Sequence, residues 1–263
     1  MNHSQVKAEA IRTSKGKRPL TMLTAYDYPT ARLLDESGVD MILVGDSVGM
    51  VVLGFEDTTH VTLSHMMHHV AAVARGVKRA MLIADLPIHT YETPTQAVET
   101  ARQLVEAGAD AVKLEGGLLQ EAKIAAIIGA GIPVVGHVGL LPQRVLLEGG
   151  YKIKGKTPTE IEALREDIHA VNRVGVCCCV VEGVRPEVAS MITDLSSVPT
   201  IGIGSGKGTC DGEVAVVSDL VGAFPWFVPS FIKPKANVAG EISQAAQDWM
   251  NEVRDHPHVQ TPQ

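Results

Sequence analysis

Short apolar runs recur along this chain, and segments with helical spacing of apolar residues separate them. The strand-like runs fall at about residues 20–25, 41–46, 80–85, 110–115, 132–137, 177–182, 198–203 and 214–218, and the eighth run is the weakest. Runs that are apolar throughout are typical of parallel strands buried on both faces. Strands that alternate with helices form parallel sheets with right-handed crossovers.

Several segments between these runs carry helix signals. Residues 93–108 begin with a Thr-Pro pair, which suits an N-cap and a first helical position, and they end at Gly108. Residues 157–175 repeat this pattern, and residues 29–38 have apolar positions at helical spacing. The pattern therefore predicts helices between the strands.

The apolar runs end, within a residue or two, on polar or ionisable side chains. In chain order these are Asp46, Asp85, Lys113 with Glu115, His137, Glu182 and Ser205. Active sites of (β/α)8 barrels are built at the carboxyl ends of the strands, whereas an open doubly wound sheet concentrates them at one switch point. The pattern predicts a (β/α)8 TIM barrel, a single domain over residues 1–263, with a disordered tail from about 254 to 263.

Three of these side chains are acids that would meet at one end of the barrel. Asp46, Asp85 and Glu115 would offer hard oxygen donors with no Cys or His between them, and this set suits Mg²⁺. The alternative is that each acid caps the following helix. Lys113 lies two residues before Glu115, so both share a strand face. An inward pair favours a functional role, and an outward salt bridge is the alternative.

Two further strand ends suggest acid–base chemistry. Glu182 directly follows an apolar run, so partial desolvation should raise its pKa and make it a usable base near neutral pH. His137 ends the fifth run, which favours a site role over a buried structural histidine. Two long connections, residues 47–63 and 138–157, are expected to form lids or binding loops.

Other features of the chain predict less. The glycine-rich residues 201–208 match neither dinucleotide-binding nor P-loop spacing, so a tight turn is expected, with phosphate binding as the alternative. His65, His68 and His69 share a helical face without a supporting acid. Residues 177–179 are consecutive cysteines that cannot converge on one metal from a strand, and buried reduced thiols are expected.

Composition excludes several classes of partner. The formal net charge is −7, and no basic patch is interleaved with aromatics, so nucleic acid is not an expected partner. No apolar stretch approaches the ~20 residues that span a bilayer, and no secretory signal opens the chain. The four cysteines show no C-x-x-C spacing. A cytoplasmic protein without membrane partners is expected.

The order and spacing of several motifs give a more specific indication. They are TAYD (24–27), VGDSVGM (44–50), ADLP (84–87), VKLEGG (112–117), GHVGLLPQ (136–143), GGYKIKG (149–155), VVE (180–182) and IGIGSG with CDG (201–212). With these motifs the chain resembles the ketopantoate hydroxymethyltransferase family, over about residues 18 to 235. The resemblance implies a (β/α)8 barrel that binds Mg²⁺.

The resemblance also implies an activity. The family transfers a one-carbon unit from 5,10-methylenetetrahydrofolate to 3-methyl-2-oxobutanoate, through an enolate that Mg²⁺ stabilises, and forms 2-dehydropantoate for pantothenate synthesis. Carried over to this chain, the metal residues are Asp46, Asp85 and Glu115, the last directly or through water. The substrate-binding residues are Asp46, Ser47, Asp85, Lys113 and His137, and Glu182 is the base. Relatives form large rings, often decamers, so a homo-oligomer is expected.

The chain departs from the family pattern at a few positions. Ile88 and His89 follow ADLP where many relatives have an aromatic residue, and Ser218 with Asp219 replaces the usual His-Asp. These changes concern the folate pocket and the rate. The alternatives are a related Mg²⁺-dependent 2-oxo acid lyase or mutase, whose KKCGH-type loop is absent from the sequence, and a non-catalytic barrel scaffold.

Overall fold

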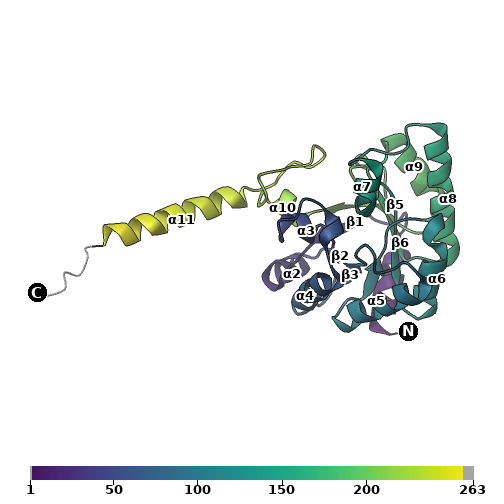
Figure 1. Cartoon of the computed structure of the whole chain (residues 1–263), viewed down its shortest axis with the longest axis horizontal. Helices are drawn as coiled ribbons and strands as arrows, with labels where there is room; N and C mark the ends of the chain where they lie inside the picture. Colours follow the sequence, from purple (N-terminus) through teal and green to yellow (C-terminus); the bar gives the residue numbers. More distant parts are fainter. Residues whose placement is uncertain (1, 257–263) are drawn as a thin grey trace, which may run out of the picture. The chain divides into compact units, whose positions relative to one another are not determined.

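A computed structural model describes residues 2–256 and contains a closed parallel barrel (Figure 1). The strands are β1 Leu20–Thr24, β2 Met41–Val44, β3 Met81–Asp85, β4 Ala111–Lys113, β5 Val134–Gly139, β6 Cys178–Glu182, β7 Thr200–Ile203 and β8 Gly212–Ala215. Each strand pairs in parallel with the next, and β8 closes the barrel against β1. The predicted (β/α)8 barrel is confirmed, and the open doubly wound sheet is wrong.

Helices lie between the strands and around the barrel. They are α1 His3–Arg12, α2 Tyr28–Glu36, α3 Val48–Val51, α4 Leu63–Ala74, α5 Pro94–Glu106, α6 Glu121–Gly129, α7 Val145–Glu148, α8 Pro158–Val174, α9 Pro186–Leu195, α10 Val217–Leu220 and α11 Val238–Asp255. Short 3₁₀ turns are η1 Thr58–His60, η2 Leu118–Gln120 and η3 Pro142–Arg144. The predicted helices correspond to α2, α5 and α8 apart from their terminal residues. Thr93 and Thr157 cap α5 and α8 through their side chains, as the sequence predicted.

The eighth strand begins earlier than the sequence suggested. The prediction placed it at 214–218, but Gly212 already pairs with Leu20 of β1 and with Ile201 of β7. A Cβ on Gly212 would lie 2.3 Å from the carbonyl oxygen of Leu20, so only glycine allows this approach. Gly212 and Glu213 look like loop residues in the sequence, because they form a strand only through pairing with β1 and β7.

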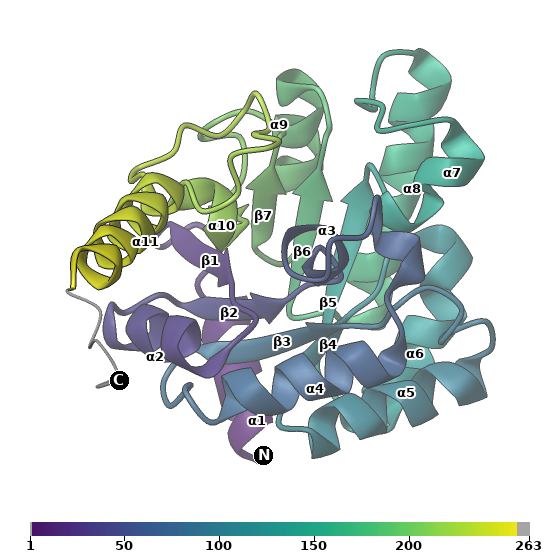
Figure 2. The same ribbon diagram turned by 60° about the vertical axis from the view of Figure 1, so that its left-hand side comes forward.

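The barrel interior is apolar from its amino-terminal end to its middle. Alternate residues of the strands point inward and form one cluster with α1, and its members include Leu20, Met22, Met41, Leu43, Met81, Ile83, Ala111, Val135, Cys178, Val180, Ile201 and Val214. Ala8 and Ile11 of α1 belong to the same cluster, so α1 closes the amino-terminal end of the barrel (Figure 2). The opposite end is left for polar side chains.

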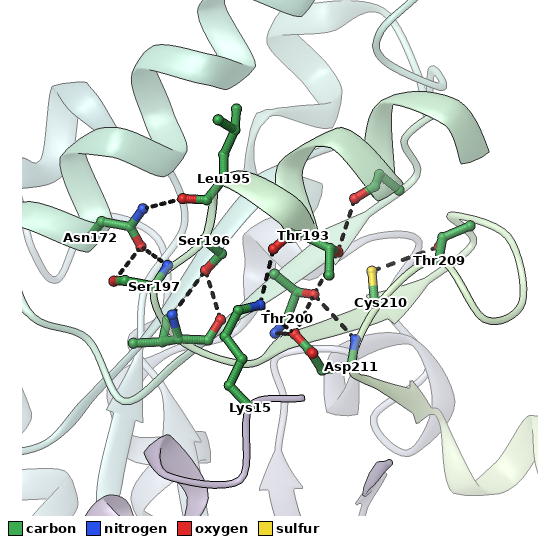
Figure 3. A network of polar contacts seen from close by, with 12 residues as sticks. Lys15, Asn172, Thr193, Leu195, Ser196, Ser197, Thr200, Thr209, Cys210 and Asp211 are labelled. Atoms are coloured by element: carbon green, nitrogen blue, oxygen red, sulfur yellow. Dashed lines mark hydrogen bonds and ion pairs between the residues drawn. The ribbon is translucent and has the colours of Figure 1, made fainter. Parts of the chain in front are cut away.

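Acids at the amino-terminal end of the barrel hold neighbouring strands together. Asp40 accepts a hydrogen bond from the Thr21 backbone N–H at 2.9 Å. Asp211 accepts from the Thr200 N–H and from Lys15 Nζ, both at 2.9 Å (Figure 3). Burial opposes ionisation of Asp211, but these hydrogen bonds and the Lys15 charge lower its pKa. These carboxylates are structural.

Among the described residues, 217–256 form a second compact unit in addition to the unit that contains the barrel strands. Within it, the backbone N–H of Val238 at the start of α11 donates to the carbonyl of Val221, just after α10. Helix α11 extends to Asp255, so the first residues of the tail that was expected to be disordered, 254 and 255, are helical. Residues 257–263 of that tail lie outside the described residues. The single-domain organisation stays a prediction. Among residues 2–256, no helix is long and apolar enough to cross a membrane.

Candidate active site

The inward face of the central strands changes from apolar to ionisable at the carboxyl end of the barrel. Successive inward positions lie two residues apart, because side chains on a strand alternate between its faces. The inward series are Ile83 then Asp85, Ala111 then Lys113 and Glu115, Val135 then His137, and Val180 then Glu182. The structure brings these side chains into one cluster, together with Asp46 and Ser47 after β2. All of the site residues predicted from the sequence lie at this end.

Asp46 and Asp85 come together across the ends of β2 and β3. The backbone N–H of Asp46 donates to Asp85 Oδ2 at 3.1 Å. A Cβ on Gly45 would lie 2.9 Å from Ser47 Oγ and 3.5 Å from Asp85 Oδ2, so a side chain there would displace the Ser47 hydroxyl. The hydroxyl of Ser47 in turn hydrogen-bonds with Tyr26 Oη at 2.8 Å.

Lys113 lies in the middle of the cluster. Its Nζ is 3.1 Å from Asp85 Oδ1 and 3.1 Å from His137 Nδ1. Lys113 Nζ and Asp85 Oδ1 are close enough for an ion pair, but their geometry is not that of a hydrogen bond. Burial alone would lower the pKa of Lys113, but Asp85, Glu115 and Asp46 together raise it, so the ammonium persists. Lys113 therefore faces inward, and the outward salt bridge considered from the sequence is wrong.

His137 is neutral and has a defined tautomer. Burial, followed by the charge of Lys113, holds its pKa well below the usual value. An ammonium group only donates, so Nδ1 must accept from Lys113 and the ring proton lies on Nε2. Nε2 is 3.2 Å from Glu182 Oε2, again without hydrogen-bond geometry. This N–H lies close to the base candidate and makes no hydrogen bond with the described residues.

Three acids of the cluster have raised pKa values, unlike Asp40 and Asp211 at the opposite end. Burial raises the pKa of Glu182 to about 7, against the lowering effect of Lys113, although 24 % of its side chain is exposed. Burial and the charge of Asp85 raise the pKa of Asp46 to about 7. The pKa of Glu115 is raised well above its usual value by burial and by Asp46. Raised values of this kind indicate acid–base chemistry.

The carboxylates retain oxygen atoms with no hydrogen-bond partner. Asp85 Oδ1 and Glu115 Oε1 are buried and accept no hydrogen bond from the described residues. No group of three or more His, Cys, Asp or Glu side chains in residues 2–256 is arranged so that it could hold a metal ion. Mg²⁺ usually takes only one or two carboxylates and completes its shell with water and substrate oxygens. The donor set therefore fits Mg²⁺ as an incomplete, open site.

Sequence reasoning gave no role to Gln143 and Tyr91. Gln143 Nε2 donates to Asp46 Oδ2 at 2.8 Å, and Tyr91 Oη donates to Gln143 Oε1. Gln143 closes the motif GHVGLLPQ, but its local pattern does not show that it reaches an acid nearly a hundred residues earlier. Its position depends on the path of the long connection after β5.

Some candidates from the sequence have structural surroundings. The Ser205 hydroxyl donates to the Val181 carbonyl and accepts from the Val184 N–H, which fits the expected turn. His65 accepts from the Thr62 N–H as part of the amino-terminal cap of α4. The consecutive cysteines 177–179 are buried free thiols, as predicted.

The fold and the site define a barrel enzyme whose acid–base cluster lies at the carboxyl ends of its strands. Residues 5–259 match the family described as ketopantoate hydroxymethyltransferase, and the chain belongs to this family. It is therefore a hydroxymethyltransferase.

Individual relatives agree with this family. The 3-methyl-2-oxobutanoate hydroxymethyltransferase of Oleidesulfovibrio alaskensis is 49% identical over 95% of this chain and 86% of that protein. The protein of the same name from Dehalococcoides mccartyi is 50% identical over 91% of this chain and 85% of its own length. A solved phosphoenolpyruvate phosphomutase from Streptomyces platensis subsp. rosaceus has a TM-score of 0.65 at 15% identity, covering 96% of this chain and 88% of its own. That likeness concerns the fold.

Proposed function

We propose that this enzyme transfers a one-carbon unit from 5,10-methylenetetrahydrofolate to 3-methyl-2-oxobutanoate, giving 2-dehydropantoate for pantothenate synthesis. Support comes from membership in the ketopantoate hydroxymethyltransferase family and from the names of its relatives. The observation that carries the proposal is the inward cluster of Asp85, Lys113, His137 and Glu182 beside Asp46. This cluster combines oxygen donors, a fixed positive charge and a base.

The metal part of the proposal rests on the three acids. Asp46 and Asp85 would hold Mg²⁺, with Glu115 directly or through water. Asp85 Oδ1 and Glu115 Oε1 are buried and accept no hydrogen bond from the described residues, which supports this assignment. When bound, Mg²⁺ would supply Lewis-acid polarisation of the keto group of the 2-oxo acid. Asp46 and Asp85 would thereby also orient the substrate.

The remaining side chains bind the substrate and move its proton. Lys113 balances the negative charge of the carboxylate and of the enolate that forms on deprotonation. His137 offers its Nε2–H, and Ser47 offers its hydroxyl, as hydrogen-bond donors to substrate oxygens. Glu182 accepts the proton from C3, a role for which a pKa of about 7 is well matched at neutral pH.

The one-carbon transfer then follows. The enolate carbon forms a C–C bond with the methylene carbon of the folate, and both bonds from that carbon to the folate nitrogens break. Water supplies the hydroxyl group, and its other hydrogen and the proton taken from C3 go to the two folate nitrogens. The folate carries the electrophile, and the protein positions it.

Small molecules are therefore the partners, and nucleic acid and membranes are not. A cytoplasmic location, supported by the four free cysteines, and a homo-oligomer complete the proposal.

Exchange of the C3 proton of 3-methyl-2-oxobutanoate in heavy water, without folate, tests the first half of this reaction. We expect NMR to show exchange that requires both the protein and Mg²⁺. Adding the folate should then yield 2-dehydropantoate. Glu182→Gln tests the base. This change keeps the size of the side chain and removes the base, so it should slow exchange by about 10²–10⁴-fold.

The outcomes separate the parts of the proposal. Normal exchange by Glu182→Gln would assign the base to another residue. Exchange by the wild-type enzyme without Mg²⁺ would contradict the metal assignment. If the substrate binds, with no exchange and no product after folate is added, the proposed activity is wrong.

A further inference from the structure

Gln143 has an unusually complete set of polar contacts for a loop residue. It lies in η3, within the long connection after β5, and only 4 % of the residue is exposed. Its backbone N–H donates to Glu115 Oε2 at 3.0 Å. Its Nε2 donates to Asp46 Oδ2 at 2.8 Å and to the Leu86 carbonyl at 2.9 Å. Its Oε1 accepts from Tyr91 Oη.

These contacts leave one orientation for the side-chain amide. Both hydrogens of Nε2 and the oxygen Oε1 are used, so the amide is fully satisfied. Rotating the amide by half a turn would place Oε1 against Asp46 Oδ2 and the Leu86 carbonyl, and Nε2 against the Tyr91 hydroxyl. The first change brings acceptors together in a buried site, which is costly. The Leu86 carbonyl therefore fixes the direction in which Gln143 donates to Asp46, and the Tyr91 hydroxyl holds the amide oxygen in place.

Gln143 also connects strand ends that are far apart in the sequence. Asp46 follows β2, Leu86 and Tyr91 follow β3, and Glu115 follows β4. One residue from the connection after β5 thus occupies one oxygen of Asp46 and one of Glu115. The other oxygen of Glu115 is left buried without a hydrogen bond from the described residues. Each acid is thereby held by Gln143 at one carboxylate oxygen.

We propose that Gln143, oriented by Tyr91, is a positioning residue that holds Asp46 and Glu115 in the arrangement needed to bind a divalent cation. This inference rests on the metal centre of the proposed function and goes beyond it, because Gln143 itself is not a ligand. Partners that orient metal ligands are typically worth about 10–100-fold in metal affinity. The loop after β5 thereby becomes a part of the metal centre.

The binding of Mg²⁺ alone, measured by titration calorimetry on the full-length protein without substrate or folate, tests this role. Gln143→Leu, which keeps the approximate size but has no polar atoms, should weaken Mg²⁺ binding by at least about tenfold. Tyr91→Phe loses only the hydroxyl that orients the amide and should weaken binding by a smaller factor. Exchange of the C3 proton by both variants should recover when Mg²⁺ is raised.

Gln96→Leu is the matched control. Gln96 is an exposed glutamine that donates to the His89 carbonyl and accepts from the Glu92 N–H, so it also loses hydrogen bonds, but it contacts no acid of the site. It should bind Mg²⁺ like the wild type. Limited trypsin digestion of the metal-free proteins gives a second readout, because Arg144 and Lys152 follow Gln143 in the loop. Cleavage there should be faster in Gln143→Leu than in Gln96→Leu.

Each outcome decides the inference. Wild-type affinity for Mg²⁺ in both Gln143→Leu and Tyr91→Phe would overturn it and leave the proposed function standing. Should Gln143→Leu fail to fold, Tyr91→Phe decides alone, and wild-type affinity there overturns the inference. Wild-type protein that binds no Mg²⁺ would overturn the metal centre, and this inference with it.

Discussion

Carboxylates lie at both ends of the barrel, and their partners differ. Asp211 and Asp40 accept backbone N–H hydrogen bonds, and these bonds, with a neighbouring cation, lower the pKa values although burial opposes the shift. Asp46 and Glu182 lie among other acids in a buried cluster, and their pKa values are raised to about 7. Asp40 and Asp211 therefore stabilise the fold, and Asp46 and Glu182 reduce stability and supply reactivity.

The first prediction concerns the pH dependence of proton exchange. A base acts only when it is deprotonated, and the pKa of Glu182 is raised to about 7. At saturating Mg²⁺ and substrate, the exchange rate should rise with pH below about 7, close to tenfold per unit well below it, and level off above. A rate that is flat from pH 5 to 8, measured by NMR, would contradict Glu182 as the base.

The second prediction concerns the stability of the metal-free protein. The pKa of Asp46 is raised from 3.8 to about 7 on folding, so the folded state prefers the protonated form. The free energy of unfolding should fall as the pH rises from about 4 to about 7, because the unfolded chain releases this proton first. Asp46→Asn should therefore stabilise the metal-free protein at pH 8 by about 1–3 kcal/mol, and by less at pH 5.

Asp211→Asn is the control for this effect, because its sign is opposite. The lowered pKa of Asp211 gives stability that is present at neutral pH and is lost as the pH falls through the folded pKa. Asp211→Asn should destabilise the protein at pH 8. Urea unfolding at both pH values measures the two variants, and a loss of stability in Asp46→Asn at pH 8 would contradict the interpretation.

The elements position the site through short strands and two long connections. The connections after β2 and β5 meet where η1 contacts η3, and Tyr151 Oη donates to Met50 Sδ between them at 3.6 Å. The turn from β5 into its connection depends on Gly139, whose φ is +103°. A Cβ at this position would lie 2.3 Å from the carbonyl oxygen of Glu182. The loop after β5 and the base on β6 are therefore coupled by one close backbone approach.

The third prediction compares two glycines of this connection. Gly149 also has a positive φ, +66°, but its Cβ would meet only Lys152 Nζ, at 3.6 Å. Gly149→Ala should cost about 1 kcal/mol for the left-handed backbone. Gly139→Ala should cost about 1–3 kcal/mol more because of overpacking, and it should slow C3 exchange by displacing Glu182. Equal stability and exchange in the two variants would contradict the coupling.

The whole molecule combines the barrel unit with a second unit that exposes large apolar side chains. In α11, Ile242, Trp249 and Val253 are spaced to share one helical face, and each is at least half exposed. Exposed apolar rows of this kind mark interaction surfaces. They support the proposal of a homo-oligomer.

The fourth prediction therefore concerns assembly. Light scattering coupled to size exclusion should give a mass that is a multiple of the 28.0 kDa chain. Trp249→Glu should shift the protein toward smaller species, since it places a charge on the apolar face. Asn251→Glu, on the opposite face of α11, should leave the mass unchanged. A monomeric wild type would contradict the homo-oligomer.

Local periodicity explains why so much of the site could be predicted from the sequence. The positions of the strands, the caps of α5 and α8, and the inward direction of Lys113 and Glu115 follow from a spacing of two residues in strands and from capping at helix starts. Because parallel strands share one direction, the side chains at their ends must gather at the same end of the barrel. The predicted site residues lie together for this reason.

Only the tertiary structure decided how these side chains interact. The contact of Gln143 with Asp46, the neutral state of His137 and the early start of β8 depend on neighbours that are distant in the chain. The sequence determined which acids enter the barrel, but their pKa values depend on burial and on the charges that barrel closure brings near them. Spacing along the chain reports local direction, and it carries no information about the solvation and partners that a closed barrel imposes.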